Sequence, residues 1–174
     1  MNTQILYPPL RRSSRRLQAA DDACMAYRLE LRRFPEPQAQ LPKLMCDPAV
    51  VAQFLYGLGL AEAPEERFYM LCLDTRNVLI AYTEVSRGTV DRSTVHPREI
   101  FRFAILAGAS RIFISHNHPS GDVSPSPQDI KVTEALSEAG KVVGIEVLDH
   151  LIVGHSLATG QRHFTSLRER GQLI

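Results

Sequence analysis

The sequence has few cysteines, no long apolar run and no strong excess of charge of either sign. Its three cysteines are widely spaced and form no Cys-x-x-Cys pair, which argues against a disulfide framework and a zinc ribbon. No apolar stretch approaches the roughly 18 residues of a membrane span, and the N-terminus shows no secretory signal. These absences predict a cytoplasmic protein that needs no membrane and keeps its thiols reduced.

The formal net charge is only +1, so bulk charge gives no reason to expect nucleic-acid binding. The charge is nevertheless uneven, because residues 1–45 hold eight basic side chains against four acidic ones. Within this segment the basic residues cluster at Arg11, Arg12, Arg15 and Arg16. A basic arm of this kind can bind nucleic acid in a salt-dependent way, and a solvated helix face explains the same cluster equally simply.

A chain of 174 residues with 44% hydrophobic residues is long enough for one domain with a substantial core. Ahead of that domain, Leu17–Phe34 has the composition of a helix, and three prolines between residues 35 and 42 then indicate a linker. We therefore expect a helical and linker appendage over residues 1–46 and the main domain over residues 47–174.

Within the main domain the hydrophobic pattern alternates between helical and extended periods. Helices are predicted from Pro48 to Gly57 or Gly59, from Pro97 to about Gly108 and from Pro127 to about Ala139. Apolar runs predict a β-hairpin and further strands over residues 68–73, 78–85, 89–95, 111–115 and 145–153, with one more short element after residue 154. This interleaving predicts an α/β or α+β sandwich around a mixed sheet.

The segment from His116 to Asp129 carries the clearest chemical signal. Side chains two apart on a strand share a face, so His116 and His118 can converge on one ion. Ser126-Pro127 then has the pattern of a helix start, which places Asp129 in the first helical turn. Two imidazoles and a carboxylate make a three-ligand set that leaves one position for water, as in hydrolytic metal sites.

A hydrolytic site also needs a base and a donor for the oxyanion. Ser126 is the candidate donor, and Glu66, directly before an apolar strand, is the preferred base. Sequence position does not separate this residue from three other glutamates, Glu65, Glu84 and Glu99. Each residue also has a simpler interpretation: the histidines as polar surface, Ser126 as a helix cap and Asp129 as a charge favoured by the helix dipole.

Two further residues and the identity of the ion stay open at this stage. Asp149 and His150 can orient a ligand imidazole, or they can be a polar pair at the end of a strand. Two imidazoles and one carboxylate suit zinc, and they also suit manganese or iron.

The spacing His-x-His, seven residues, Ser, two residues, Asp resembles the JAMM motif of the JAB/MPN metalloproteases. The RadC-like branch of that superfamily is closer still, and the resemblance covers roughly residues 47–174. Besides the histidine segment, it is carried by Glu66-Arg67-Phe68, Leu73-Asp74-Thr75-Arg76-Asn77, Glu84-Val85-Ser86-Arg87-Gly88-Thr89, His96-Pro97-Arg98-Glu99 and Leu148-Asp149-His150-Leu151-Ile152-Val153-Gly154.

The resemblance implies a cytidine-deaminase-like α/β sandwich with a mixed sheet flanked by helices. It implies one zinc ion per chain and hydrolysis of peptide or isopeptide bonds by a catalytic domain over residues 47–174. It assigns His116, His118 and Asp129 as ligands, Glu66 as the acid/base and Ser126 as the oxyanion donor. The substrate would be an unidentified peptide or protein, and the resemblance leaves the oligomeric state open.

RadC-like proteins also carry a historical DNA-repair name. Their usual helix-hairpin-helix region has Gly-rich hairpins that residues 1–46 lack. This chain is therefore similar to the short form found on mobile elements and prophages. Two rival functions follow: a nucleic-acid-associated accessory protein of the DNA-repair type, and a metal-binding scaffold without turnover.

Overall fold

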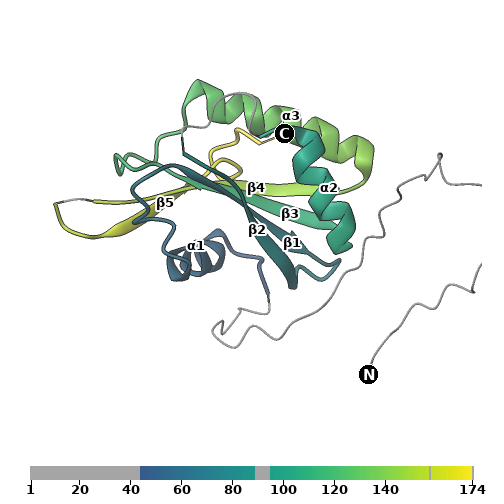
Figure 1. Ribbon diagram of the computed structural model, residues 1–174, viewed down its shortest axis with the longest axis horizontal. Helices are drawn as coiled ribbons and strands as arrows, with labels where there is room; N and C mark the ends of the chain where they lie inside the picture. Colours follow the sequence, from purple (N-terminus) through teal and green to yellow (C-terminus); the bar gives the residue numbers. More distant parts are fainter. Residues whose placement is uncertain (1–43, 89–94, 157, 174) are drawn as a thin grey trace, which may run out of the picture. The chain divides into compact units, whose positions relative to one another are not determined.

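The structure, a computed structural model, describes residues 44–88, 95–156 and 158–173. These residues form three helices and a five-stranded sheet (Figure 1). The elements are α1 (Pro48–Gly57), β1 (Arg67–Leu73), β2 (Leu79–Arg87), α2 (Pro97–Ala107), β3 (Arg111–Asn117), α3 (Pro127–Val143), β4 (Glu146–His155) and β5 (Arg162–Ser166). The helix expected over Leu17–Phe34, the linker after it and residues 89–94 of an expected strand lie outside the described residues.

The strands lie in the order β2-β1-β3-β4-β5. Strands β3 and β4 are parallel, whereas the other three neighbouring pairs are antiparallel, so the sheet is mixed as predicted. The parallel pair is joined through α3, as parallel strands require a crossover. Strand β3 is thus the central strand, and its C-terminal end lies between β1 and β4.

The three helices begin alike, with a capping side chain followed by proline at the first helical position. Asp47 accepts a bond from the Ala49 amide at 2.8 Å, and His96 accepts one from the Arg98 amide at 3.1 Å. Ser126 caps α3 in the same way. Proline suits this position because its fixed φ is helical and its missing N–H has no partner there. The start of α3 is therefore set locally by Ser126-Pro127.

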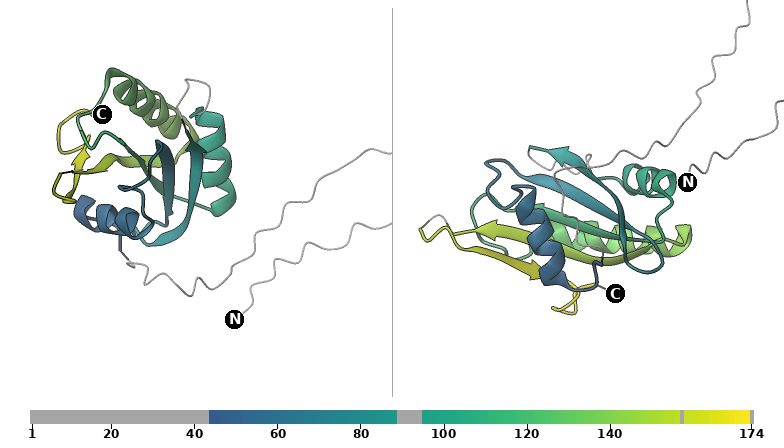
Figure 2. Two further views of the ribbon diagram at one scale, coloured as in Figure 1. Left: turned by 60° about the vertical axis from the view of Figure 1, so that its left-hand side comes forward. Right: turned by 90° about the horizontal axis from the view of Figure 1, so that it is seen from below.

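The helices cover both faces of the sheet, α1 on one face and α2 with α3 on the other (Figure 2). Alternate residues of β1 divide between the two layers. Leu71 and Leu73 pack on the α1 side, whereas Met70 and Cys72 pack on the side of α2 and α3. These four side chains are fully buried. Burying a side chain of leucine size stabilises the folded protein by about 1.5–3 kcal/mol relative to leaving it exposed.

One helix extends beyond its sequence prediction. Helix α3 continues to Val143 instead of ending near Ala139. Gly140, which follows the predicted end, is needed for close packing, because a Cβ there would lie 2.5 Å from the Ile145 carbonyl oxygen. The helix ends instead at Gly144, in the left-handed conformation with a φ of 78°. The short element expected after residue 154 is strand β5.

Candidate metal centre

His116 and His118 continue one face of β3 beyond the apolar core. Ile112 and Ile114 pack in the layer of α2 and α3, and alternation places both histidines on that same face. His118 lies just beyond the strand, yet its amide donates to the Val153 carbonyl at 3.0 Å and so keeps the chain alongside β4. The two imidazole rings therefore lie side by side, with centroids 4.8 Å apart.

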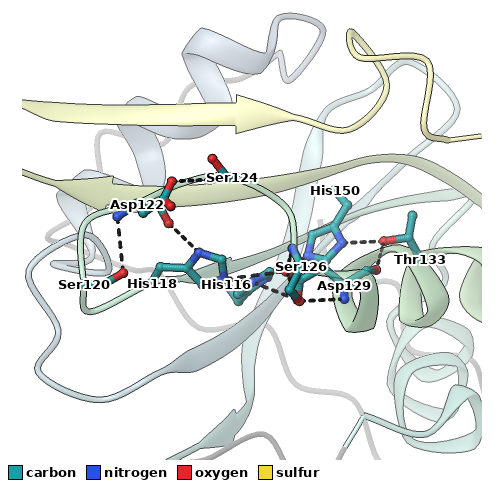
Figure 3. A network of polar contacts seen from close by, with 9 residues as sticks. All are labelled: His116, His118, Ser120, Asp122, Ser124, Ser126, Asp129, Thr133 and His150. Carbon is teal, nitrogen blue, oxygen red and sulfur yellow. Dashed lines mark hydrogen bonds and ion pairs between the residues drawn. The ribbon is translucent and has the colours of Figure 1, made fainter.

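Asp129 reaches the same point from the first turn of α3 (Figure 3). Its Oδ1 lies 3.3 Å from His116 Nε2, and its Oδ2 lies 3.6 Å from His118 Nε2. The two Nε2 atoms are 3.0 Å apart. Within the described ranges, these three residues are the group of His, Cys, Asp or Glu side chains close enough together to hold a metal ion.

A chain of hydrogen bonds behind His116 determines which of its nitrogens carries the proton. The Thr133 hydroxyl donates its single proton to the backbone carbonyl of Asp129 at 2.6 Å. The hydroxyl oxygen must therefore accept from His150 Nδ1, also at 2.6 Å. His150 Nε2 is then an acceptor, and His116 Nδ1 donates to it at 2.8 Å. This assignment, made from the hydrogen-bond pattern, leaves the lone pair of His116 on Nε2.

His118 is held in the same tautomer by a backbone carbonyl. Its Nδ1 lies 2.6 Å from the Asp122 carbonyl oxygen, which can only accept, so Nδ1 carries the proton. The lone pairs of both imidazoles therefore belong to Nε2, and both Nε2 atoms face the Asp129 carboxylate. Three electron-rich atoms directed at one point can bind a cation, and two imidazoles with a carboxylate are a ligand set that suits zinc.

Ser126 orients the Asp129 carboxylate. The Ser126 amide and hydroxyl both donate to Asp129 Oδ2 at 2.7 Å, and the Asp129 amide donates back to Ser126 Oγ at 3.2 Å. This is the reciprocal capping box that the Ser-x-x-Asp spacing predicts. Asp129 Oδ1 accepts none of these bonds and is the oxygen nearer to His116.

Burial and neighbouring charges adjust the protonation of the three residues. Burial lowers the pKa of His116 to about 4, so this imidazole is neutral at neutral pH. Burial alone would raise the pKa of Asp129, but the adjacent imidazoles of His118 and His116 and the hydrogen bonds from Ser126 bring it well below its usual range. The adjacent Asp129 carboxylate in turn raises the pKa of His118. A cation binding here would compete with protonation of His118.

Glu66 faces this cluster across a cavity of about 330 Å³ that is also lined by both histidines, Asp129 and Ser126. Phe68, Val95 and Val132 form an apolar part of the wall. Burial raises the pKa of Glu66, and only part of that increase is offset by His118. A half-buried carboxylate with a raised pKa is suited to accepting and returning a proton.

The other glutamates that sequence position left open are engaged with arginines elsewhere. Glu65 lies 3.5 Å from Arg67, and Glu84 accepts hydrogen bonds from Arg87 and Tyr69. Glu99 pairs with arginines on α2. None of these three glutamates lines the cavity beside the histidines.

Asp149 and His150, the two candidates for orienting a ligand imidazole, have different hydrogen-bond partners. His150 contacts His116 directly, as described above. The Asp149 carboxylate instead accepts bonds from the Ser166 hydroxyl at 2.5 Å and from the His150 and Arg168 amides at 2.7 and 3.0 Å. It therefore holds the turn after β5. Thr133 could not be predicted from the sequence, because a threonine one helical turn after Asp129 gives no signal of its contact with His150 on β4.

Thr133→Val should weaken metal binding without touching a donor atom. Valine leaves the buried His150 N–H without an acceptor, which costs about 1–3 kcal/mol of stability and frees His116 to change tautomer. Loss of such a supporting partner typically lowers metal affinity roughly 10–100-fold. Chelator competition with zinc as the probe measures this affinity.

Ser137→Ala, one turn further along α3, is the matched control for Thr133→Val. The Ser137 hydroxyl is buried and has no hydrogen-bond partner among the described residues. Its removal should leave both stability and zinc affinity nearly unchanged. Unchanged zinc affinity in Thr133→Val would show that the Thr133–His150 contacts do not support His116.

Gly121→Ala should destabilise the loop that joins the histidines to α3. Gly121 has a φ of 82°, and a Cβ there would lie 2.5 Å from the His155 carbonyl oxygen of β4. We expect a loss of stability about 1–3 kcal/mol larger than in Gly160→Ala, since overpacking adds to the cost of the left-handed backbone. Gly160 shares the positive φ, at 67°, but has open space around it. Urea unfolding measures the difference, and equal losses would contradict the close packing.

The fold and the cluster define an α/β domain that carries a His-His-Asp group at the end of its central strand. Residues 45–172 match the family model described as the RadC-like JAB domain, and the chain belongs to this family. This agrees with the resemblance noted in the sequence and with its α/β architecture.

Individual relatives are 40–50% identical to this chain over the aligned residues. UPF0758 protein Mbar_A2303 of Methanosarcina barkeri is 40% identical over 153 residues, which cover 87% of this chain and 64% of the relative. UPF0758 protein STH371 of Symbiobacterium thermophilum is 45% identical over 129 residues, covering 74% and 52%. A UPF0758 protein of Desulforudis audaxviator is 50% identical over 106 residues, covering 61% and 44%. The matched part of this chain thus spans about half to two thirds of the length of these relatives.

The names of the relatives state no activity. Among the described residues, none of the helices is both long enough and apolar enough to span a bilayer.

Proposed function

We propose that this protein is a zinc-dependent hydrolase of peptide or isopeptide bonds, with one zinc ion per chain. The observation that carries the proposal is the convergence of two imidazole lone pairs and a carboxylate on one point, in a cavity that also contains Glu66. A structural site would be closed by a fourth protein ligand. Here the described residues supply three, which is typical of catalytic sites.

His116 Nε2, His118 Nε2 and the Asp129 carboxylate are the proposed ligands. A zinc ion held there would lower the pKa of water toward about 7 and polarise the carbonyl of the bond to be cleaved. The hydrogen bonds from His116 through His150 to Thr133 keep the His116 lone pair on Nε2, where it would bind the ion, and the Asp122 carbonyl does the same for His118.

Glu66 is the proposed acid/base of the reaction. Its carboxylate would take a proton from the attacking water and pass it to the nitrogen of the leaving amine. The raised pKa that burial gives Glu66 supports both transfers, because a base with a pKa nearer to neutrality returns its proton more readily.

Ser126 is the proposed donor to the oxyanion. In the structure its hydroxyl donates to Asp129 Oδ2, so the O–H must turn toward the cavity as negative charge develops on the carbonyl oxygen. The Ser126 amide keeps its own bond to Asp129 throughout and preserves the orientation of the ligand.

The substrate we propose is a peptide or protein with an accessible amide, and its sequence is open. The arginine cluster behind the nucleic-acid alternative lies at residues 11–16, outside the described residues, and nucleic-acid binding stays a prediction. A titration against duplex and single-stranded DNA at low salt tests it.

A panel of fluorogenic peptides and lysine-isopeptide conjugates, incubated with the zinc-loaded protein, tests the proposed activity. We expect cleavage of at least one class that is lost in His118→Ala and in the presence of a chelator. A zinc-loaded protein that cleaves no amide in the panel would favour the alternative of a metal-binding scaffold.

A further inference from the structure

Asn117, the residue between the two candidate ligand histidines, has its side chain on the opposite face of β3 and is fully buried. Every hydrogen bond of its side chain goes to one short segment of backbone, residues 63–67, which leads into β1. Its Nδ2 donates to the carbonyls of Ala63 and Glu65, both at 3.1 Å. Its Oδ1 accepts from the Arg67 amide at 2.8 Å.

Two of these bonds bracket Glu66. The Glu65 carbonyl belongs to the peptide group before Glu66, and the Arg67 amide belongs to the peptide group after it. The peptide group after Glu66 has a further hydrogen bond, because the Gly88 amide donates to the Glu66 carbonyl at 2.9 Å. Fixing both peptide planes fixes φ and ψ of Glu66, and therefore the direction in which its side chain leaves the backbone.

The strand register explains why a side chain performs this task. In the antiparallel pair of β1 and β3, Phe68 lies opposite His116. One residue earlier, the backbone ladder between β1 and β3 stops, so Arg67 and Asn117 are not paired through their backbones. The Asn117 amide replaces the missing backbone partners at this position. Continued by two residues, the same register brings Glu66 to the level of His118.

We propose that Asn117 is a positioning residue for Glu66: it fixes the backbone on both sides of the acid/base and so aims the carboxylate at the metal centre. The inference rests on the proposed function for its catalytic consequence. Asn117 thereby links the placement of Glu66, the residue directly before β1, to the strand end that carries both histidines.

The direct test observes Glu66 itself and needs no substrate. In full-length, zinc-loaded protein labelled with ¹³C-glutamate, the Glu66 carboxyl signal is identified by its absence in Glu66→Gln. In Asn117→Ala we expect this signal to move toward the other glutamate signals while bound zinc stays within about twofold of the wild type. Asn117→Asp has the same shape and keeps an acceptor for the Arg67 amide. It loses both N–H donors to the Ala63 and Glu65 carbonyls, so the Glu66 signal should move in the same direction. This variant replaces Asn117→Ala in the test if Asn117→Ala does not fold.

Ser166→Ala is the matched control, since it removes a buried hydrogen bond to Asp149 that involves no residue near Glu66. It should leave the Glu66 signal in place. An unmoved Glu66 signal in folded Asn117 variants would overturn the inference. So would the loss of zinc from those variants, because Asn117 would then act through the histidines.

Kinetics test the catalytic consequence separately. With a cleaved peptide from the panel, Asn117→Ala should lower kcat by about 10²-fold and change KM little, the size expected for a misplaced catalytic group. In a Glu66→Gln background the same change should cause no further loss. An additive loss would contradict a role through Glu66. A wild-type protein that cleaves nothing refutes the proposed function and leaves the spectroscopic result standing.

Discussion

Glu66→Gln should lower the rate of amide hydrolysis by about 10²–10⁴-fold and leave zinc bound, since general acid–base catalysis contributes an effect of that size. Glutamine has nearly the same shape as glutamate but cannot accept the proton of the attacking water. None of the proposed ligands changes, so the metal content should equal that of the wild type. Single-turnover rates with the zinc-loaded variant measure the effect.

Glu65→Gln is the matched control, because it makes the same chemical change one residue away. Its carboxylate lies 3.5 Å from Arg67 and 3.6 Å from Arg87, in contacts that are partly exposed. Exposed pairs of this kind contribute about 0–1 kcal/mol, so activity and stability should change little. A Glu66→Gln variant with full activity would exclude Glu66 as the base, and equal losses in both variants would point to a disturbance of the segment instead.

Zinc should stabilise the folded protein strongly, and this gain should disappear in His118→Ala. A ligand that binds the folded state at about 100 times its Kd adds about 2.7 kcal/mol to the free energy of unfolding. His118→Ala removes a donor with little effect on the core, because this side chain is partly exposed. Thermal unfolding of metal-free protein with increasing zinc measures the gain.

His96→Ala provides the comparison for this prediction. His96 caps α2 with its imidazole and belongs to no part of the cavity. Loss of the cap should lower stability by roughly 0.5–2 kcal/mol while the zinc-dependent gain stays intact. A zinc-dependent gain of equal size in His118→Ala would place the ion somewhere other than the cluster of His116, His118 and Asp129.

Much of the candidate site could be predicted from the sequence because its signals are local. His116, His118, Ser126 and Asp129 lie within one segment, where strand alternation and the Ser-Pro helix start determine their placement. The hairpin of β1 and β2 and all three described helices follow from the same kind of local pattern.

The remaining features depend on register and packing between distant segments. Sequence position favoured Glu66 but did not separate it from Glu65, and only the folded structure shows that Glu66 lines the cavity beside the histidines and Glu65 does not. The roles of His150 and Thr133 required α3 to cross β4 at one particular level. Alternation along one strand could suggest only that Asp149 and His150 face opposite sides, not which of them faces the metal centre.

The length of α3 illustrates a second limit of local signals. Glycine predicts a helix end when nothing is known of its surroundings, because it is a poor helix former. Gly140 is retained inside the helix because the turn into β4 passes against it, a contact that only the folded structure reveals.

Metal content tests the central claim most directly. Elemental mass spectrometry should be applied to the full-length protein and to His118→Ala, both after incubation with equal amounts of zinc, manganese and iron and removal of unbound ions. We predict close to one zinc per chain in the wild type and little metal in the variant. No bound metal in the wild type, or an equal amount in both proteins, would contradict a metal centre built from His116, His118 and Asp129.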